Sequence, residues 1–274
     1  MTTTLSTPAR HRARFHTLTV ANVERLTDDA VALTFTVPDD LVQEYAFLPG
    51  QHLTLRADIQ GQDVRRSYSI CRSARFVEAN KQLRVATARV AGGLMSNWIN
   101  DTVAVGDQIE VMTPAGSFTC PTEPTRAKHH VAIVGGSGIT PVMSLLTTAL
   151  EDEPDSRATL LYGNRRASTV MFLEELSDLK NAYPTRFHFI NVLEDEAPDV
   201  ELFHGRLDKA RLTTILDQIV GLDSVDEWYL CGPLPMVEGA QALLDERGVD
   251  TKIIHHELFH VDDCLLYTSP SPRD

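Results

Sequence analysis

The sequence predicts two domains of different fold class: a six-stranded antiparallel β-barrel, then a doubly wound α/β domain with a five-stranded parallel sheet. Short strand-like runs separated by turns fill the first half, whereas apolar runs alternate with amphipathic helices in the second half. The pattern changes across the proline-containing stretch 121–128. A chain of 274 residues is long enough for two such domains.

The strands expected in the first half are rich in β-branched and apolar residues. The clearest of them alternates, with Leu53, Leu55, Ala57 and Ile59 on one face, as in a half-buried strand. The expected strands are residues 15–23, 30–37, 52–59, 65–71, 82–90 and 108–112. Their short length and regular spacing favour a barrel or sandwich.

The second half begins with an apolar run, 130–134, that does not alternate, as expected for a parallel strand buried on both faces. Pro141 then stands in the first turn of the following helix, where proline is tolerated. The expected strands are 130–134, 158–162, 187–193, 227–231 and 252–258. The expected helices are 141–150, 171–183, 209–220 and 235–246. Strands that alternate with helices predict a doubly wound parallel sheet.

Charge and composition exclude several classes of protein. A net charge of −13 argues against a nucleic-acid partner, which would require a basic surface. The sequence has no apolar stretch of about 18 residues, so we expect no membrane partner. Four widely spaced cysteines fit neither a disulfide framework nor a metal pattern, and the ten histidines show no metal-ligand spacing. We therefore expect a cytoplasmic protein without a metal site.

The two ends of the chain differ from the rest. Residues 1–14 are polar and basic and predict a disordered arm without a secretory signal. We place the barrel domain at 15–123 and the α/β domain at 124–260. Residues 261–274 look like a translated cloning scar and are excluded from the fold.

A glycine-rich turn, Gly135-Gly136-Ser137-Gly138-Ile139-Thr140-Pro141, joins the first parallel strand to its helix. Glycines allow a ligand to approach the backbone, and the free N–H groups at a helix start favour an anion such as a dinucleotide phosphate. Many such turns are glycine-rich for steric reasons alone, and without other support the two interpretations are about equally good.

The segment Arg66-Ser67-Tyr68-Ser69 ends a strand and offers a guanidinium, a ring and a hydroxyl. These groups suit a flavin, with Arg66 on the pyrophosphate, Tyr68 against the ring and Ser69 near N5. Tyr68 as an ordinary cross-strand aromatic is the alternative. The segment Gly92-Gly93-Leu94-Met95-Ser96-Asn97-Trp98 is a second glycine-rich turn that enters a helix, either a phosphate cradle or a simple cap.

Cys231-Gly232-Pro233 ends the fourth parallel strand, at the sheet edge where ligands bind in such folds. Cys231 is either a nicotinamide contact or a small buried residue. Glu257 and Phe259 on the last strand are either part of the same pocket or ordinary strand residues. Arg165 and Arg166 follow the second strand, with no acidic residue directly at that strand end. They favour NADPH over NADH, unless they are merely solvated.

In this order, the motifs resemble those of the ferredoxin–NADP reductase family over residues 15–259. Segments 47–55, 66–73 and 162–165 are more narrowly similar to reductase subunits of bacterial phenylacetyl-CoA epoxidases. That resemblance implies FAD, NADPH, an iron–sulfur domain or protein as electron acceptor, and an oxygenase component as partner. A carboxy-terminal [2Fe–2S] domain is expected only in a full-length form, so we expect this chain to be a truncated fragment; a natural two-domain reductase is the alternative.

The resemblance also implies roles for individual residues. Ser69, Cys231 and Glu257 would be catalytic. The cofactor-binding residues would be Arg66, Tyr68, Ser69, Ile70, Gly92, Gly93, Met95, Ser96, Gly135, Gly136, Gly138, Thr140, Pro141, Asn164, Arg165, Gly232, Pro233 and Phe259.

The implied function is hydride transfer from NADPH to FAD, followed by single-electron transfer toward a di-iron oxygenase that acts in phenylacetate degradation. Two alternatives stay open. One is a free-standing NAD(P)H:acceptor reductase or flavohaemoglobin-like module, and the other is a non-catalytic nucleotide-binding subunit.

Overall fold

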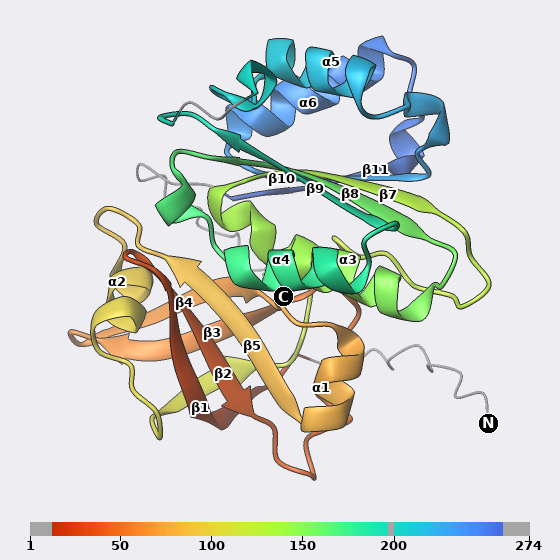
Figure 1. The fold of residues 1–274 in the computed structure, drawn as a ribbon. Coiled ribbons are helices and arrows are strands. Elements are labelled where there is room, and N and C mark those ends of the chain that lie inside the picture. The colour runs from red at the N-terminus through yellow and green to blue at the C-terminus, as the bar shows by residue number, and fades with distance from the viewer. Residues whose placement is uncertain (1–12, 197–199, 260–274) are drawn as a thin grey trace, which may run out of the picture.

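The computed structural model describes residues 13–196 and 200–259, and it contains the two expected domains (Figure 1). Most of the expected arm and the whole expected tail lie outside the described residues. The first domain is a curled antiparallel sheet in the order β4-β3-β6-β1-β2-β5. Its strands are β1 (Phe15–Thr27), β2 (Ala30–Thr36), β3 (His52–Ile59), β4 (Gln62–Ser69), β5 (Gln82–Ala88) and β6 (Gln108–Met112).

The alternation of β3 sets the register of the strand that carries the arginine–tyrosine–serine motif. Leu53 and Leu55 are fully buried, and they pair with Tyr68 and Arg66 on the same face. β4 starts three residues earlier than expected, because polar residues of the hairpin also pair. It ends at Ser69, after which the chain meets β5 only through an isolated bridge.

Two helices belong to the barrel domain, α1 (Ala74–Asn80) and α2 (Leu94–Asp101). No pattern in the sequence predicts α1. Its start is capped by Ser73, whose hydroxyl accepts a hydrogen bond of 3.2 Å from the backbone N–H of Phe76. None of its residues is buried, so it lacks the apolar periodicity that reveals a helix in sequence.

The second domain is a parallel sheet in the order β11-β10-β7-β8-β9. Its strands are β7 (His129–Gly135), β8 (Arg157–Asn164), β9 (Phe187–Leu193), β10 (Glu227–Gly232) and β11 (Ile254–Leu258). Its helices are α3 (Ile139–Asp152), α4 (Leu173–Ala182), α5 (Lys209–Gln218) and α6 (Leu234–Glu246). α3 and α4 lie between the sheet and the barrel, and α5 and α6 cover the opposite face (Figure 1). The expected fold class is therefore confirmed.

The strand order reverses between β7 and β10, so a crevice is expected at the carboxyl ends of these two strands. Alternate residues of β7 enter different apolar clusters: Ala132 and Val134 pack with α3 and α4, and Val131 and Ile133 pack with α5 and α6. The first of these clusters also includes barrel residues Ala30, Ala32, Cys71 and Ala86, and it holds the domains together.

Within the described ranges, no helix has both the length and the apolar character needed to cross a bilayer. In the same ranges, no three His, Cys, Asp or Glu side chains converge as a metal site requires.

Candidate functional site

One contact joins the barrel to the carboxyl edge of the parallel sheet. The hydroxyl of Ser69, at the end of β4, donates a long hydrogen bond of 3.5 Å to Oε2 of Glu257 on β11. Glu257 lies beside Cys231 in the register of β10 and β11. The structure thus brings the three expected catalytic residues together at one place between the domains.

Burial controls the protonation of these groups. It raises the pKa of the Glu257 carboxyl, and the hydrogen bond from Ser69 offsets only part of this effect. Burial also raises the pKa of the Cys231 thiol well above its ordinary value, and the nearby charge of Glu257 adds to the shift. Cys231 is therefore a neutral thiol, and Glu257 takes up a proton more readily than an exposed glutamate does.

The glycine-rich turn packs directly against the end of β10. A Cβ atom on Gly138 would lie 2.3 Å from the carbonyl oxygen of Cys231, so only glycine fits there. Gly135 is similarly close to Pro233, whose Cδ would lie 2.9 Å from an added Cβ. Gly136 differs from both: its φ is +51°, and nothing lies within 4 Å of its Cβ position. The turn therefore packs closely against the end of β10 at Gly135 and Gly138, and it has open space around Gly136.

Two hydroxyl groups hold this turn in shape. Thr140 is buried in the first turn of α3, as is Pro141, and its Oγ1 donates to the carbonyl of Ser137 at 3.0 Å. Tyr162, fully buried on β8, donates its hydroxyl to the carbonyl of Gly136 at 2.9 Å. The sequence analysis missed Tyr162, because a tyrosine within an apolar strand is indistinguishable from an ordinary core aromatic.

On the barrel side, Tyr68 is half-buried on β4, and burial raises the pKa of its phenol to about 12. Arg66 is exposed, and its Nη1 donates to the carbonyl of Arg65 at 2.7 Å. Ile70 is fully buried and bridges to Val85 of β5. Tyr68 and Arg66 thus keep part of their surface accessible near the end of β4, whereas Ile70 is enclosed in the barrel core.

The second glycine turn leads into α2. Gly92 has a φ of +70° with open space around its Cβ position, and Gly93 precedes the first residue of the helix. Ser96 is buried and accepts the backbone N–H of Val90 at 3.2 Å, and Met95 packs in the barrel core. Of this expected phosphate cradle, the backbone at Gly92 is what faces outward.

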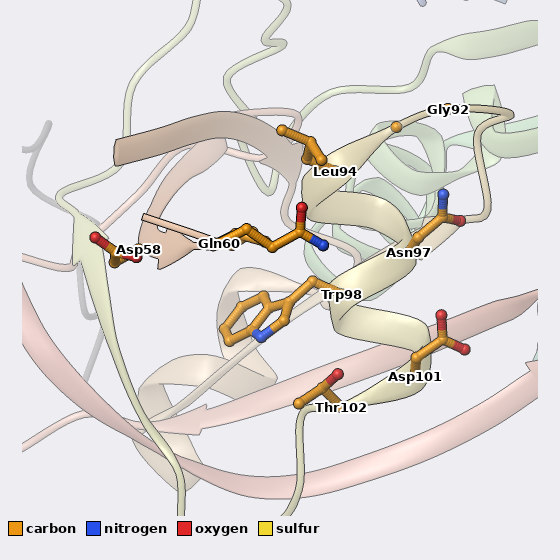
Figure 2. A pocket seen from close by; sticks show the side chains of 10 residues that line it. Asp58, Gln60, Gly92, Leu94, Asn97, Trp98, Asp101 and Thr102 are labelled. Carbon is orange, nitrogen blue, oxygen red and sulfur yellow. The ribbon is translucent and has the colours of Figure 1, made fainter. Parts of the chain in front are cut away.

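A cavity of about 560 Å³ adjoins this turn, between α2 and the turn that links β3 to β4 (Figure 2). The indole of Trp98 and the side chain of Gln60 are among the groups that line it (Figure 2). Asp58 and Asp101 stand at its sides, and the backbone of Gly92 lies along its edge (Figure 2).

The end of β8 differs from the sequence-based expectation. Acidic residues that follow β9 fold back beside it: the backbone N–H of Asp195 donates to the carbonyl of Arg165 at 2.8 Å, and its carboxylate pairs with Arg166 at 3.5 Å. The Nδ2 of Asn164 donates to Asn191 at 3.5 Å. Arg165 is exposed and has no ion-pair partner within the described part of the chain.

Gly232 and Phe259 complete the carboxyl edge of the sheet. Gly232 has a φ of +147°, and a Cβ added there would lie 2.9 Å from the backbone nitrogen of Gly135. The N–H of Phe259 donates to the carbonyl of Gly232 at 3.4 Å, and its ring packs on the cluster between the domains.

These residues fit a bound flavin and a dinucleotide. The open backbone at Gly136 and Gly92 suits two phosphate groups, and the exposed Arg66 adds a charge. A half-buried tyrosine, a neutral thiol and a carboxyl of raised pKa stand around the place where the two domains meet. This arrangement suits two stacked aromatic rings better than a hydrolytic reaction.

Two protein-family models match the chain in the expected order. The oxidoreductase FAD-binding domain matches residues 17–120, and the oxidoreductase NAD-binding domain matches residues 132–242.

Two relatives indicate the kind of protein. The chain is 40% identical to a subunit of 1,2-phenylacetyl-CoA epoxidase from Escherichia coli, over 90% of this chain and 68% of that protein. It is 35% identical to the ferredoxin reductase component of 3-ketosteroid-9-alpha-monooxygenase of Rhodococcus rhodochrous, over 94% and 68% of the two chains.

Solved structures show the same architecture. A cytochrome P450 reductase of Amycolatopsis matches with a TM-score of 0.76 and 28% identity, over 91% of this chain and 71% of that one. The FAD/NAD-binding domain of nitric oxide dioxygenase from Vibrio cholerae matches with a TM-score of 0.74 and 25% identity, over 89% and 98%.

Proposed function

This chain belongs to the ferredoxin–NADP reductase family of FAD- and NAD-binding oxidoreductases, and we propose that it draws electrons from NADPH through FAD for an iron–sulfur acceptor. Family membership makes it an NAD(P)H-dependent flavin reductase, so the non-catalytic alternative is set aside. The preference for NADPH, the acceptor and the roles of single residues are the proposal. A cytoplasmic location stays a prediction.

The proposed partner is an oxygenase that acts on an aromatic CoA thioester in phenylacetate degradation. Support comes from the names of the two relatives above, one a part of an epoxidase and the other the ferredoxin reductase component of a monooxygenase. The chain spans 68% of each, so a cluster domain in a longer form and a separate iron–sulfur protein both satisfy the proposal.

When bound, FAD supplies a ring that takes up a hydride as an electron pair and releases electrons singly. In our proposal, Tyr68 packs against that ring and Arg66 holds its pyrophosphate. Ser69 presents its hydroxyl toward the reacting atoms, and it hydrogen-bonds Glu257 at 3.5 Å. Glu257, whose pKa is raised by burial, takes up a proton more readily than an exposed glutamate and accepts the hydroxyl of Ser69.

On the nucleotide side, the backbone of the glycine-rich turn binds the phosphates, and Gly136 provides the open position. Cys231 forms the wall beside the nicotinamide as a neutral thiol, so it adds no charge to the site. Thr140 and Tyr162 keep the turn in shape through their bonds to its carbonyls. Placement to within about 3–3.5 Å of the reacting atoms governs the rate of such transfers.

The observation that carries this proposal is the contact between Ser69 and Glu257, because it joins the end of β4 in the barrel domain to the carboxyl edge of the parallel sheet. The test is reconstitution of the purified chain with FAD, followed by NADPH oxidation with ferricyanide as acceptor. We expect a yellow protein that oxidises NADPH. A protein that takes up no flavin would contradict the proposal.

A matched pair of tyrosine variants tests the flavin site itself. We expect Tyr68→Ala to weaken FAD binding by roughly thirtyfold, because burying one aromatic side chain contributes about 1.5–3 kcal/mol. Tyr162→Phe removes only a hydroxyl behind the glycine turn and should leave FAD binding unchanged. Titration of the apoprotein with FAD measures both, and equal losses would remove Tyr68 from the site.

A free-standing reductase or flavohaemoglobin-like module is the second candidate. Support comes from the FAD/NAD-binding domain of nitric oxide dioxygenase from Vibrio cholerae named above, which has the same two-domain architecture. Purified plant-type ferredoxin and a purified bacterial haemoglobin domain as competing electron acceptors separate the two. Faster reduction of the haem would favour the alternative.

A further inference from the structure

A cluster of ion pairs around the buried Arg84 connects the barrel to α4, away from the site described above. Arg84 of β5 is 1% exposed, and its Nη1 donates to both carboxylate oxygens of Glu175 on α4, at 2.8 and 3.0 Å. Its Nη2 donates to Glu24 of β1 at 2.7 Å. Arg72, three residues after Ser69, donates to the same Glu175 at 2.9 Å. Two guanidinium groups of the barrel therefore hold one carboxylate of the nucleotide domain.

Phe172, the residue that precedes α4, has a strained backbone conformation and contacts this cluster. Phe172 has a φ of +60° and a ψ of 25°, a left-handed conformation that is uncommon for a bulky residue. Its ring lies under the guanidinium of Arg84, with 5.2 Å between the carbon of that group and the ring centre. Strain of this kind persists only where the surroundings fix the conformation. The start of α4 is therefore set by the barrel as well as by its own sheet.

The segment that follows β4, the strand with Tyr68 and Ser69, also contacts α3. The backbone N–H of Ala74 donates to Thr148 at 3.2 Å, and Arg75 pairs with the buried Asp152 at 2.6 Å. α3 opens at the glycine-rich turn, and α4 follows the end of β8, where Arg165 stands. Residues 72–75 thus tie both helices next to the nucleotide crevice to the strand that carries Tyr68 and Ser69.

We propose that Glu175 is a positioning residue, whose bonds to Arg72 and Arg84 set the alignment of the nicotinamide with the flavin. The inference rests on the proposed hydride transfer and names a residue that touches neither ring. A buried ion pair is weak support for stability by itself, since desolvation offsets much of its attraction. Alignment alone would give Glu175 a large effect on the rate, because a shift of about 1 Å can slow a transfer roughly a hundredfold.

The experiment compares Glu175→Gln with Glu174→Gln in the FAD-loaded chain. Both remove one negative charge from the first turn of α4, but Glu174 is exposed and outside the cluster. We expect Glu175→Gln to lower the stopped-flow rate of flavin reduction at saturating NADPH by roughly tenfold or more. It should also weaken the flavin difference spectrum that oxidised nucleotide induces, with FAD affinity unchanged. Glu174→Gln should match the wild type.

Arg72→Gln provides a second, milder variant, because Arg84 still holds Glu175. If both residues act through one contact, the double variant is no slower than the worse single variant. This variant decides the question if Glu175→Gln does not fold. Wild-type rates and spectra in Glu175→Gln, or in Arg72→Gln, would overturn the positioning role. A wild-type chain that binds FAD but shows neither flavin reduction nor a difference spectrum would instead overturn the proposed function.

Discussion

Glu153 and Glu227 at the amino end of the parallel sheet are paired with histidine or lysine side chains, whereas Glu257 at the carboxyl end meets the barrel at the Ser69 hydroxyl. His130 and Glu153 are both buried and 3.3 Å apart, and Glu153 also accepts the hydroxyl of Ser156 at 2.7 Å. Glu227 accepts His255 at 2.8 Å and pairs with Lys128. Glu257, on the neighbouring strand, has one hydrogen bond to the residues that the structure describes, at 3.5 Å.

The pKa values of the two strand glutamates follow this difference. Burial acts to raise the pKa of Glu227, but its bonds to His255 and Lys128 outweigh it and bring the pKa to about 2. Burial raises the pKa of Glu257, and Ser69 compensates only in part. One end of the sheet thus stabilises the fold through satisfied charges. The other end keeps an incompletely satisfied carboxyl where chemistry is proposed, as is common at active sites.

The largest effect is expected from Gly138→Ala, which breaks the close approach at the carboxyl end. Its Cβ would lie 2.3 Å from a backbone oxygen, so the turn must move away from Cys231. We expect a loss of roughly 2–3 kcal/mol in unfolding free energy and a fall in flavin reduction of about a hundredfold.

Gly239→Ala on α6 is the matched control, because its Cβ meets Lys209 at an ordinary 3.6 Å. We expect this change to stabilise the helix by about 0.5–1 kcal/mol, with no change in flavin reduction. Chemical denaturation and stopped-flow absorbance measure both variants. If Gly138→Ala were as harmless as its control, the tight packing of the turn would not matter.

Replacing one glutamate by glutamine at each end of the sheet tests the difference between the two ends directly. Glu227→Gln should cost about 2 kcal/mol of unfolding free energy, because charge-assisted hydrogen bonds are lost, and it should leave flavin reduction unchanged. Glu257→Gln should do the reverse, slowing turnover by roughly tenfold with little loss of stability. If the two variants lost similar unfolding free energy and similar turnover rate, the proposed difference in role between the two ends would be wrong.

Arg165→Ala tests the nucleotide preference at the carboxyl end of β8. We expect it to raise the apparent KM for NADPH by about tenfold, since a charge-assisted bond to the 2′-phosphate contributes roughly 1.5–3 kcal/mol before solvent screening. The KM for NADH should not change. Arg166→Ala is the control, because Arg166 already pairs with Asp195. Equal changes for NADPH and NADH would exclude a phosphate contact.

The smallest expected effect is a pair of opposite pH dependences. Since the pKa of Glu227 is lowered in the folded chain, its contribution to stability is present above the ordinary value of 4.5 and is lost as pH falls toward about 2. Since the pKa of Glu257 is raised, the folded chain binds the extra proton, so stability declines as pH rises from 4.5 through the raised pKa.

Unfolding free energies measured against pH for the wild type and the two glutamine variants check these signs. The wild type should lose its advantage over Glu227→Gln in acid. Relative to Glu257→Gln, it should instead lose stability as pH rises above 4.5. The same sign for both glutamates would contradict the assignment of either environment.

Local sequence patterns were sufficient for most of the fold. The alternation at Leu53 and Leu55 placed β3, and the apolar run of β7 followed by glycines placed the turn that meets β10. β1 continues four residues past its expected end, because Glu24, Arg25 and Thr27 still pair with β2. α1 escaped prediction because none of its residues is fully buried and it begins from a single serine cap.

The features that could be predicted from the sequence are local ones: the period of the strands, the chemistry of the turns and the motifs that lie within a few residues of one another. Only the tertiary structure decided that Ser69 meets Glu257, that Arg84 and Arg72 share Glu175, and that Tyr162 supports Gly136. The physical reason is that these contacts depend on how two separately formed domains pack. That packing is set by buried apolar surface and charge pairing, which no single segment of the chain contains.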